Sequence, residues 1–170
     1  MNQGLVHLYW GNGKGKTTAA MGLALRALCQ GLRVTIVQFL KDGCSGELDG
    51  LRKLGAVVIA NDPSEKFTFE MTDAEKQLVQ AAQNDCLHQA RKLPCDLLVL
   101  DEACCAWESG MIDQSLLHKT VLERPAEQEI ILTGRSPAPW MREMADYSTE
   151  MVCHRHPFER GIQARKGVEY

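Results

Sequence analysis

A chain of 170 residues with a formal net charge of −3 is long enough to form one domain with a sizeable core. Its 19 basic and 22 acidic residues nearly balance, which gives no overall attraction to nucleic acid or to an anionic membrane surface. No apolar run approaches the roughly 18 residues that cross a membrane, and no basic and then apolar signal segment opens the sequence. The seven cysteines, an odd number without a C-x-x-C pair, indicate free thiols in a reducing cytoplasm. We therefore expect one cytoplasmic domain over residues 1–170 that acts neither on nucleic acid nor at a membrane.

A glycine-rich stretch joins a predicted strand at residues 5–10 to a predicted helix that continues to about Cys29. This order of strand, glycine-rich turn, Gly-Lys-Thr and helix is typical of a phosphate-binding loop, whose backbone N–H groups and helix dipole attract phosphate. Lys16 is expected to reach the outer phosphates, and the Thr17 hydroxyl to bind Mg²⁺. The usual first glycine of the motif is replaced by Trp10. A glycine-rich turn that binds nothing is the alternative, which the flanking strand and helix disfavour. The predicted nucleotide-binding residues of this stretch are Gly11, Asn12, Gly13, Lys14, Gly15, Lys16, Thr17 and Thr18.

The second predicted strand, residues 33–40, is nearly continuously apolar and therefore indicates a buried strand. Its carboxyl end brings Gln38 and Lys41 to the edge of the sheet where ligands bind in open parallel sheets. Residues 41–50 are rich in Gly, Asp and Ser, which predicts a mobile loop over the site.

A third short strand at residues 56–60 leads through a turn to two phenylalanines, Phe67 and Phe69. If that segment is extended, both rings lie on one face, although ordinary core packing is the alternative for any pair of phenylalanines. Thr72 followed by Glu75 is a capping box, which predicts a helix from there to about Lys92.

Residues 95–102 form an apolar run that ends in Asp101 and Glu102, the pattern of a Walker-B strand whose acids hold Mg²⁺ directly or through water. Carboxylates that merely cap the next helix are the alternative. The position of the acids after a phosphate-binding loop favours the metal interpretation. Cys104 and Cys105, which follow, are interpreted as small residues buried in a packed helix.

The rest of the chain predicts a helix at residues 113–122, a fifth strand at 129–133, a helix at 139–145, a last central strand at 148–154 and an edge strand at 167–170. Arg135 follows the fifth strand, where it would meet a phosphate, an acidic partner or only a surface neighbour. His154 and His156 could face one metal ion, but the sequence supplies no evident third ligand. Alternating strands and helices predict an α/β fold of the P-loop NTPase type, with a mostly parallel, doubly wound sheet of about five to six strands and helices on both faces.

These motifs together resemble the ATP:corrinoid adenosyltransferases of the cobalamin pathway. The resemblance rests on the loop with its additional Lys14, and it extends from about Gly4 to Tyr170, nearly the whole chain. The family likewise has no glycine at the position of Trp10. Further matching segments are residues 37–41, 98–102, 132–135, 149–151, 154–156, 161–164 and 167–170.

The resemblance implies that cob(I)alamin or a corrinoid precursor attacks the ribose C5′ of ATP, so that the deoxyadenosyl group moves to cobalt and triphosphate leaves. Cobalt(I) is itself a strong nucleophile, and the protein must therefore orient C5′ and stabilise the charged leaving group. Lys16, Thr17 and Glu102 are the predicted catalytic residues, and Thr17, Asp101 and Glu102 the predicted Mg²⁺ ligands. ATP is the co-substrate, and a reductase or flavodoxin-type electron donor and a homodimer are the implied partners.

In the family an aromatic segment lies by the lower face of the corrinoid, and Phe67 and Phe69 correspond to it. One of these family aromatics is often Trp where this chain has Phe69. The first strand begins by residue 5, so we expect the N-terminal extension that covers the site in some members to be absent, and closure to be weaker or supplied by another segment.

Two other classes of function share the loop and the acid pair. One is an ATP-hydrolysing switch or motor module acting on a macromolecular partner, for which Arg135 is the one plausible arginine finger in the chain. The other is a nucleic-acid-binding ATPase, which the acidic balance and the lack of a basic stripe disfavour.

Overall fold

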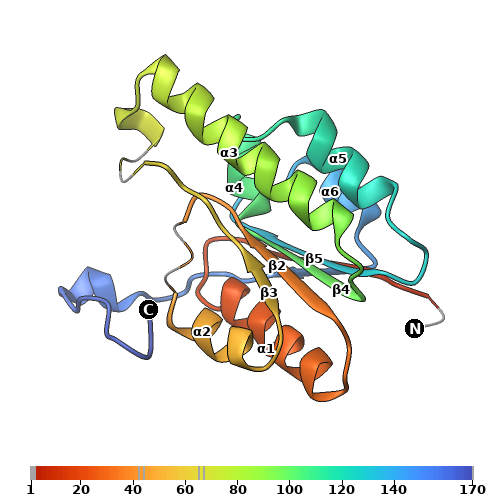
Figure 1. Cartoon of the computed structure of the whole chain (residues 1–170). Coiled ribbons are helices and arrows are strands. Elements are labelled where there is room, and N and C mark those ends of the chain that lie inside the picture. The colour runs from red at the N-terminus through yellow and green to blue at the C-terminus, as the bar shows by residue number, and fades with distance from the viewer. Residues whose placement is uncertain (1–2, 42, 44, 65, 67, 170) are drawn as a thin grey trace.

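Six parallel strands form one sheet in the order β3-β2-β4-β5-β1-β6 in the computed structural model (Figure 1). The structure describes residues 3–41, 43, 45–64, 66 and 68–169. The strands are β1 Val6–Trp10, β2 Val34–Gln38, β3 Val57–Ile59, β4 Leu97–Asp101, β5 Glu129–Gly134 and β6 Tyr147–Glu150.

Helices cover both faces of this sheet (Figure 1). One face carries α1 Lys16–Cys29 and α2 Gly46–Lys53, and the other carries α3 Asp73–Lys92, α4 Ala103–Glu108, α5 Gln114–Leu122 and α6 Pro139–Met144. Two short 3₁₀ turns, η1 Thr68–Glu70 and η2 Pro157–Arg160, lie outside these layers. The predicted α/β class, the parallel sheet and the helices on both faces are confirmed.

Alternation along the central strands sends side chains into two hydrophobic clusters. In β4, Leu98 and Leu100 pack with α3, α5 and α6, whereas Leu97 and Val99 pack with α1 and α2. All four side chains are almost completely buried. A strand that is buried on both faces has no polar side to show, which is why the sequence of β4 is continuously apolar.

Two expectations about local structure are wrong. Gly46 to Gly50, within the predicted mobile loop, form the first part of α2, because Leu48 and Leu51 lie on one side of the helix and are buried against the sheet and α1. The predicted last central strand is shorter and is an edge strand, β6, which among the described strands pairs with β1 alone and has four exposed residues.

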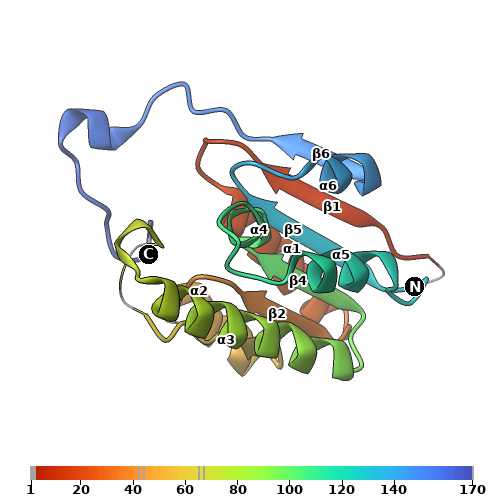
Figure 2. The same cartoon turned by 90° about the horizontal axis from the view of Figure 1, so that it is seen from above.

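The C-terminal segment also differs from its prediction. After β6 the chain leaves the sheet and extends beyond the carboxyl ends of the strands (Figure 2). Residues 166–169 form a turn and not the predicted edge strand.

The predicted capping box of α3 is confirmed, since the Thr72 side chain accepts from the backbone N–H of Glu75 and the Glu75 side chain accepts from that of Thr72. Within the described residues no helix combines the length and apolar character needed to cross a bilayer.

Candidate functional site

The glycine-rich loop occupies residues 11–15 between β1 and α1, as predicted. Gly11 has a φ of 106° and Gly15 a φ of 115°, a left-handed backbone that favours glycine. The loop also lies very close to the chain that follows β6, because the N–H of Gly13 donates to the carbonyl of Met151 at 2.6 Å. A Cβ atom on Gly13 would be 2.7 Å from that carbonyl oxygen, so no larger residue fits there.

Trp10, which replaces the usual first glycine of the motif, contacts β6 and α6. Its indole N–H donates to the Ser148 hydroxyl at 3.1 Å, and the Arg142 guanidinium lies 4.2 Å from the centre of its ring. Trp10 therefore connects the end of β1 to β6 and α6, beside the start of the loop. Arg142 over the ring is a cation–π contact.

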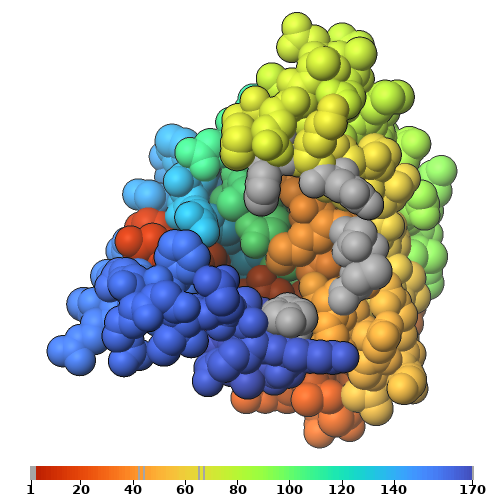
Figure 3. All heavy atoms as spheres, turned by 90° about the vertical axis from the view of Figure 1, so that its left-hand side faces the viewer, coloured from red at the N-terminus to blue at the C-terminus, as the bar shows by residue number. Residues whose placement is uncertain are grey.

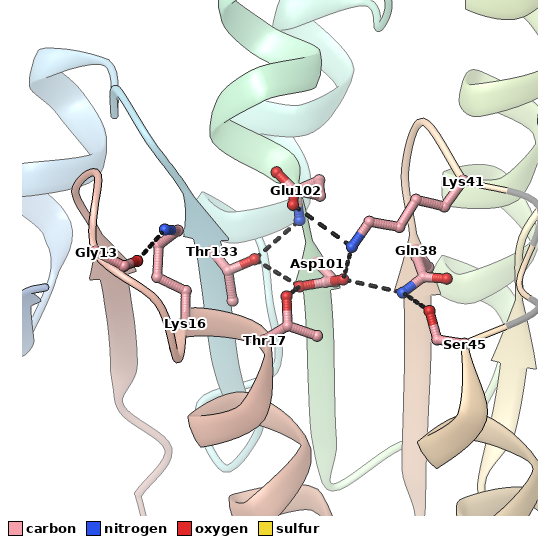
Figure 4. A network of polar contacts seen from close by, with 9 residues as sticks. All are labelled: Gly13, Lys16, Thr17, Gln38, Lys41, Ser45, Asp101, Glu102 and Thr133. Atoms are coloured by element: carbon pink, nitrogen blue, oxygen red, sulfur yellow. Dashed lines mark hydrogen bonds and ion pairs between the residues drawn. The ribbon is translucent and has the colours of Figure 1, made fainter. Parts of the chain in front are cut away.

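Lys16 begins α1 and bends back over the loop. Its ammonium donates to the carbonyl of Gly13 at 2.7 Å (Figure 4). The first-turn N–H groups of α1 and this ammonium concentrate positive charge on one side of the loop, which is the arrangement that attracts phosphate.

Asp101, at the carboxyl end of β4, is the centre of a polar network (Figure 4). Its Oδ1 accepts from the hydroxyls of Thr17 at 2.8 Å and Thr133 at 2.7 Å. Its Oδ2 accepts from the Gln38 amide at 3.0 Å and the Lys41 ammonium at 3.2 Å. The carboxylate is completely buried, so these four donors replace the water it would otherwise bind. The sequence-predicted residues Thr17, Gln38 and Lys41 are thus brought together on one carboxylate.

Glu102 lies beside this network in an unusual backbone conformation. Its φ is 61°, in the left-handed region, and its N–H donates to the Thr133 hydroxyl at 2.9 Å. Its carboxylate lies 3.5 Å from the Lys41 ammonium. Burial by itself lowers the pKa of Lys41, but Asp101 and Glu102 more than offset it, so the pKa is raised above its ordinary value. A charged ammonium therefore bridges the two acids.

These residues fit a magnesium site of the P-loop type. The hydroxyl of Thr17 and a carboxylate oxygen of Asp101 are 2.8 Å apart, and oxygen is the ligand that Mg²⁺ prefers. Within the part of the chain that the structure describes, no three His, Cys, Asp or Glu side chains cluster as a metal site. Mg²⁺ would therefore take its other ligands from phosphate and water. His156, one of the two histidines considered as a metal pair, accepts a hydrogen bond from the N–H of Phe158 at the start of η2.

A cavity of about 620 Å³ lies in front of the loop. One side is formed by residues 12–18 with Glu102 and Arg135, and the other by residues of the C-terminal segment. Figure 3 shows the corresponding edge of the molecule, hollowed between the blue C-terminal segment and the yellow chain around η1. Arg135 is exposed and lines the cavity, and its backbone carbonyl accepts from the N–H of Gly11 at 3.1 Å. Arg135 therefore lines the same cavity as the glycine-rich loop.

The predicted aromatic segment is only partly described. Phe67 lies outside the described residues. Phe69 belongs to η1, a 3₁₀ turn, so the condition under which both rings would lie on one face, an extended segment, is not met where the structure describes it. The Phe69 side chain is 82% exposed, and it is therefore not a core residue either.

The two adjacent cysteines do not supply a reactive thiolate. Cys104 is buried, and burial, assisted by Cys105 and Glu102, raises its pKa to about 12. Cys105 is half-buried, and burial together with Glu102 raises its pKa to about 11. Both thiols are thus protonated at neutral pH, and Cys104 is the small buried residue that was predicted.

Sequence reasoning missed Thr133 and the C-terminal wall of the cavity. The position of Thr133 at the carboxyl end of β5, next to Gly134-Arg135, was a usable signal, because ligands bind at that edge of a parallel sheet. The wall formed by residues 156–165 carries no local signal of nucleotide contact, since it is neither glycine-rich nor part of a regular element for most of its length.

A glycine-rich loop between β1 and α1, facing a buried acid at the end of β4, defines a P-loop protein that binds a nucleoside triphosphate. The family model described as ATP:corrinoid adenosyltransferase BtuR/CobO/CobP matches residues 2–170, and the chain belongs to this family. It is a transferase that moves the adenosyl group of ATP to a corrinoid, and the switch or motor alternative is not favoured.

Curated relatives agree along nearly the whole chain. A corrinoid adenosyltransferase of Pseudomonas aeruginosa is 36% identical over 173 residues, which cover 99% of this chain and 84% of the relative. The corrinoid adenosyltransferase of a Sinorhizobium species is 33% identical, covering 99% and 81%, and that of Escherichia coli K12 is 32% identical, covering 99% and 86%. Among solved structures, a T48 deacetylase with substrate aligns over 88% of each chain at 14% identity with a TM-score of 0.29, which carries no argument.

Proposed function

We propose that this chain transfers the 5′-deoxyadenosyl group of ATP to the cobalt(I) of cobalamin or a precursor, and that triphosphate leaves whole. The electron pair of cobalt(I) forms the bond to C5′, and the C5′–O bond breaks with its electrons moving to the triphosphate. The observation that carries this proposal is the family match over residues 2–170, and the network that joins Thr17 of the loop to Asp101 of β4 supports it.

In this reaction the protein must bind and orient ATP and stabilise the negative charge that develops on the leaving triphosphate. Backbone N–H groups of residues 14–18 and the ammonium of Lys16 bind the phosphates, whereas the N–H groups of Gly11 and Gly13 already donate to carbonyls of the chain. Lys41 and Arg135 supply further positive charge from β2 and β5, and Gln38 positions Asp101 through the hydrogen bond at 3.0 Å. Thr17, Asp101 and Glu102 would hold Mg²⁺, which when bound neutralises phosphate charge.

The experiment that tests the proposal follows the fate of ATP. The protein is mixed with Mg-ATP and chemically reduced cobalamin, and the absorbance change of cobalt–carbon bond formation is recorded together with the phosphate product. We expect a light-sensitive corrinoid and one triphosphate for each adenosyl group transferred. Release of orthophosphate without that corrinoid would refute the proposal.

Phe69 is proposed to lie against the lower face of the corrinoid when cobalt(II) is reduced. Replacing it by alanine should lower the rate with cobalt(II) cobalamin and a reductase by about 10-fold, because an apolar contact of this kind contributes a few kcal/mol at most. The rate with chemically prepared cobalt(I) should stay near that of the wild type. Leu78→Ala, which removes another exposed apolar side chain at the surface of α3, serves as the control. Equal wild-type and Phe69→Ala rates in the reductase assay would remove this role from Phe69.

The proposed cellular setting follows from the family. We propose a single domain over residues 1–170 that acts as a cytoplasmic homodimer and receives its electron from a reductase or flavodoxin-type donor. Light scattering on the purified protein tests the dimer, and cobalt(II) reduction with a purified flavodoxin tests the donor.

A further inference from the structure

The C-terminal segment, residues 156–169, forms one wall of the cavity without being anchored by a core. Pro157, Phe158 and Arg165 are among the cavity-lining residues. Every residue from Phe158 to Glu169 is exposed, although the Glu169 side chain itself is only 24% exposed, and no residue of this range belongs to the three hydrophobic clusters of the described chain. Burial of apolar surface therefore does not hold this wall in place, and a few polar contacts must do so.

The end of the segment is folded into a turn by Arg165 and Glu169. The Glu169 carboxylate accepts from the backbone N–H of Arg165 at 2.8 Å, from its Nε at 3.1 Å and from its Nη2 at 3.0 Å. The N–H of Glu169 donates to the carbonyl of Arg165 at 2.9 Å. Hydrogen bonds from Arg165 hold the pKa of Glu169 at about 2, so the pair stays charged at neutral pH.

This turn meets the phosphate-binding loop at Lys14. The Lys14 ammonium donates to the carbonyl of Val168 at 3.2 Å, which joins two parts of the chain that are 154 residues apart in sequence. The positive charge of Lys14 also contributes to the lowered pKa of Glu169, after the larger effects of Arg165. The two lysines of the loop therefore lie differently, since Lys16 folds back onto the carbonyl of Gly13.

We propose that Lys14 is a positioning residue that fastens the C-terminal segment over the phosphate-binding loop and thereby makes Arg165 part of the ATP-binding cavity. This rests on the proposed function of that cavity. The fastened segment adds the Arg165–Glu169 ion pair to a site that receives a triphosphate, and the Arg165 side chain stays 60% exposed within that pair. In molecules where the segment is detached, the cavity lacks one wall, so the apparent affinity for ATP falls in proportion to the fraction that remains fastened.

The direct test measures the segment itself in protein without nucleotide. Hydrogen–deuterium exchange is compared between the wild type, Lys14→Gln and Lys92→Gln, the last being a control at an exposed lysine in the last turn of α3. We expect exchange in peptides covering residues 162–169 to be about 5-fold faster in Lys14→Gln only, with peptides of the sheet unchanged. Unchanged exchange of that segment in Lys14→Gln would overturn the proposal, because a residue that contacted only phosphate would have no effect without nucleotide.

Kinetics supply the second readout. We expect Lys14→Gln to raise the KM for ATP by about 3- to 10-fold with kcat within about 2-fold of the wild type, since fastening favours bound substrate and transition state alike. Glu169→Gln opens the same turn, so the double variant should be no worse than the poorer single variant. Additive effects, or a higher KM for ATP without faster exchange, would refute a shared fastening role. Wild-type protein that makes no cobalt–carbon bond would refute the proposed function but leave the exchange result intact.

Discussion

Replacing Lys16 by alanine is expected to lower kcat/KM by at least about 10²- to 10³-fold, the range found when one donor to a developing charge is removed. The variant lacks the ammonium of Lys16, the first residue of α1, which faces the loop. It therefore lacks the positive charge that stabilises the negative charge on the leaving triphosphate. The rate of cobalt–carbon bond formation with chemically reduced cobalamin, recorded over a range of Mg-ATP concentrations, measures this effect.

The same substitution should leave the fold nearly unchanged, so the catalytic role of Lys16 can be measured separately from its contribution to stability. In the structure the Lys16 ammonium donates to the carbonyl of Gly13, within the loop itself. The free energy of unfolding should therefore change by less than about 1 kcal/mol. Lys16→Arg, which keeps the charge but not its compact shape, should recover only part of the activity. An alanine variant within about 3-fold of wild-type kcat/KM would exclude a role in stabilising the leaving group.

Replacing Asp101 by alanine is expected to remove activity and also to destabilise the protein by about 3–5 kcal/mol. The reason is that the variant lacks the buried carboxylate that accepts four hydrogen bonds. Thr17, Thr133, Gln38 and Lys41 all donate to this carboxylate. Without it, two hydroxyls, an amide and an ammonium lose their acceptor, and the donors on Gln38 and Thr133 are almost completely buried. Urea unfolding measures the stability, and the shift in its midpoint should occur without a change in slope.

Two further variants test whether the stability of the protein depends on the hydrogen-bond network around Asp101 or only on the charge of its carboxylate. Asp101→Asn keeps the shape but turns an NH₂ group toward donors, so it should also destabilise the protein. Glu102→Ala removes the adjacent acid, whose side chain is 25% exposed, and should cost less than about 1 kcal/mol while lowering activity. Equal stability losses in Asp101→Ala and Glu102→Ala would contradict the assignment of Asp101 as the structural centre of the site.

Most regular elements followed from local patterns, and the errors have physical causes. The helix α2 was missed because Gly46 and Gly50 weaken a helical pattern, while the buried contacts of Leu48 and Leu51 that stabilise the helix come from the rest of the fold. Strand order is also non-local. Nothing in residues 148–154 says that only β1 will pair with them, so their place at the sheet edge could not be read from the sequence.

For the site, the sequence predicted which residue types would gather at the carboxyl edge of the sheet. Thr17 and Asp101 belong to motifs with known relative positions, and they lie 2.8 Å apart. The place of the Lys41 ammonium between Asp101 and Glu102 depends on how β2 and β4 pair, and no motif encodes it.

By itself the sequence determined the phosphate-binding loop and the apolar strand with its terminal acids, because each depends on residues close together in the chain. It also determined the family resemblance, which rests on the order of short motifs along nearly the whole chain. Tertiary structure alone decided that Gly13 must be glycine against Met151, and that Trp10 packs toward Ser148 and Arg142. It also decided that Lys14 turns to the C-terminal segment while Lys16 turns to the loop. The physical reason is that the Lys16 contact lies within the loop, whereas the place of the Lys14 ammonium depends on Val168, which is 154 residues away in sequence.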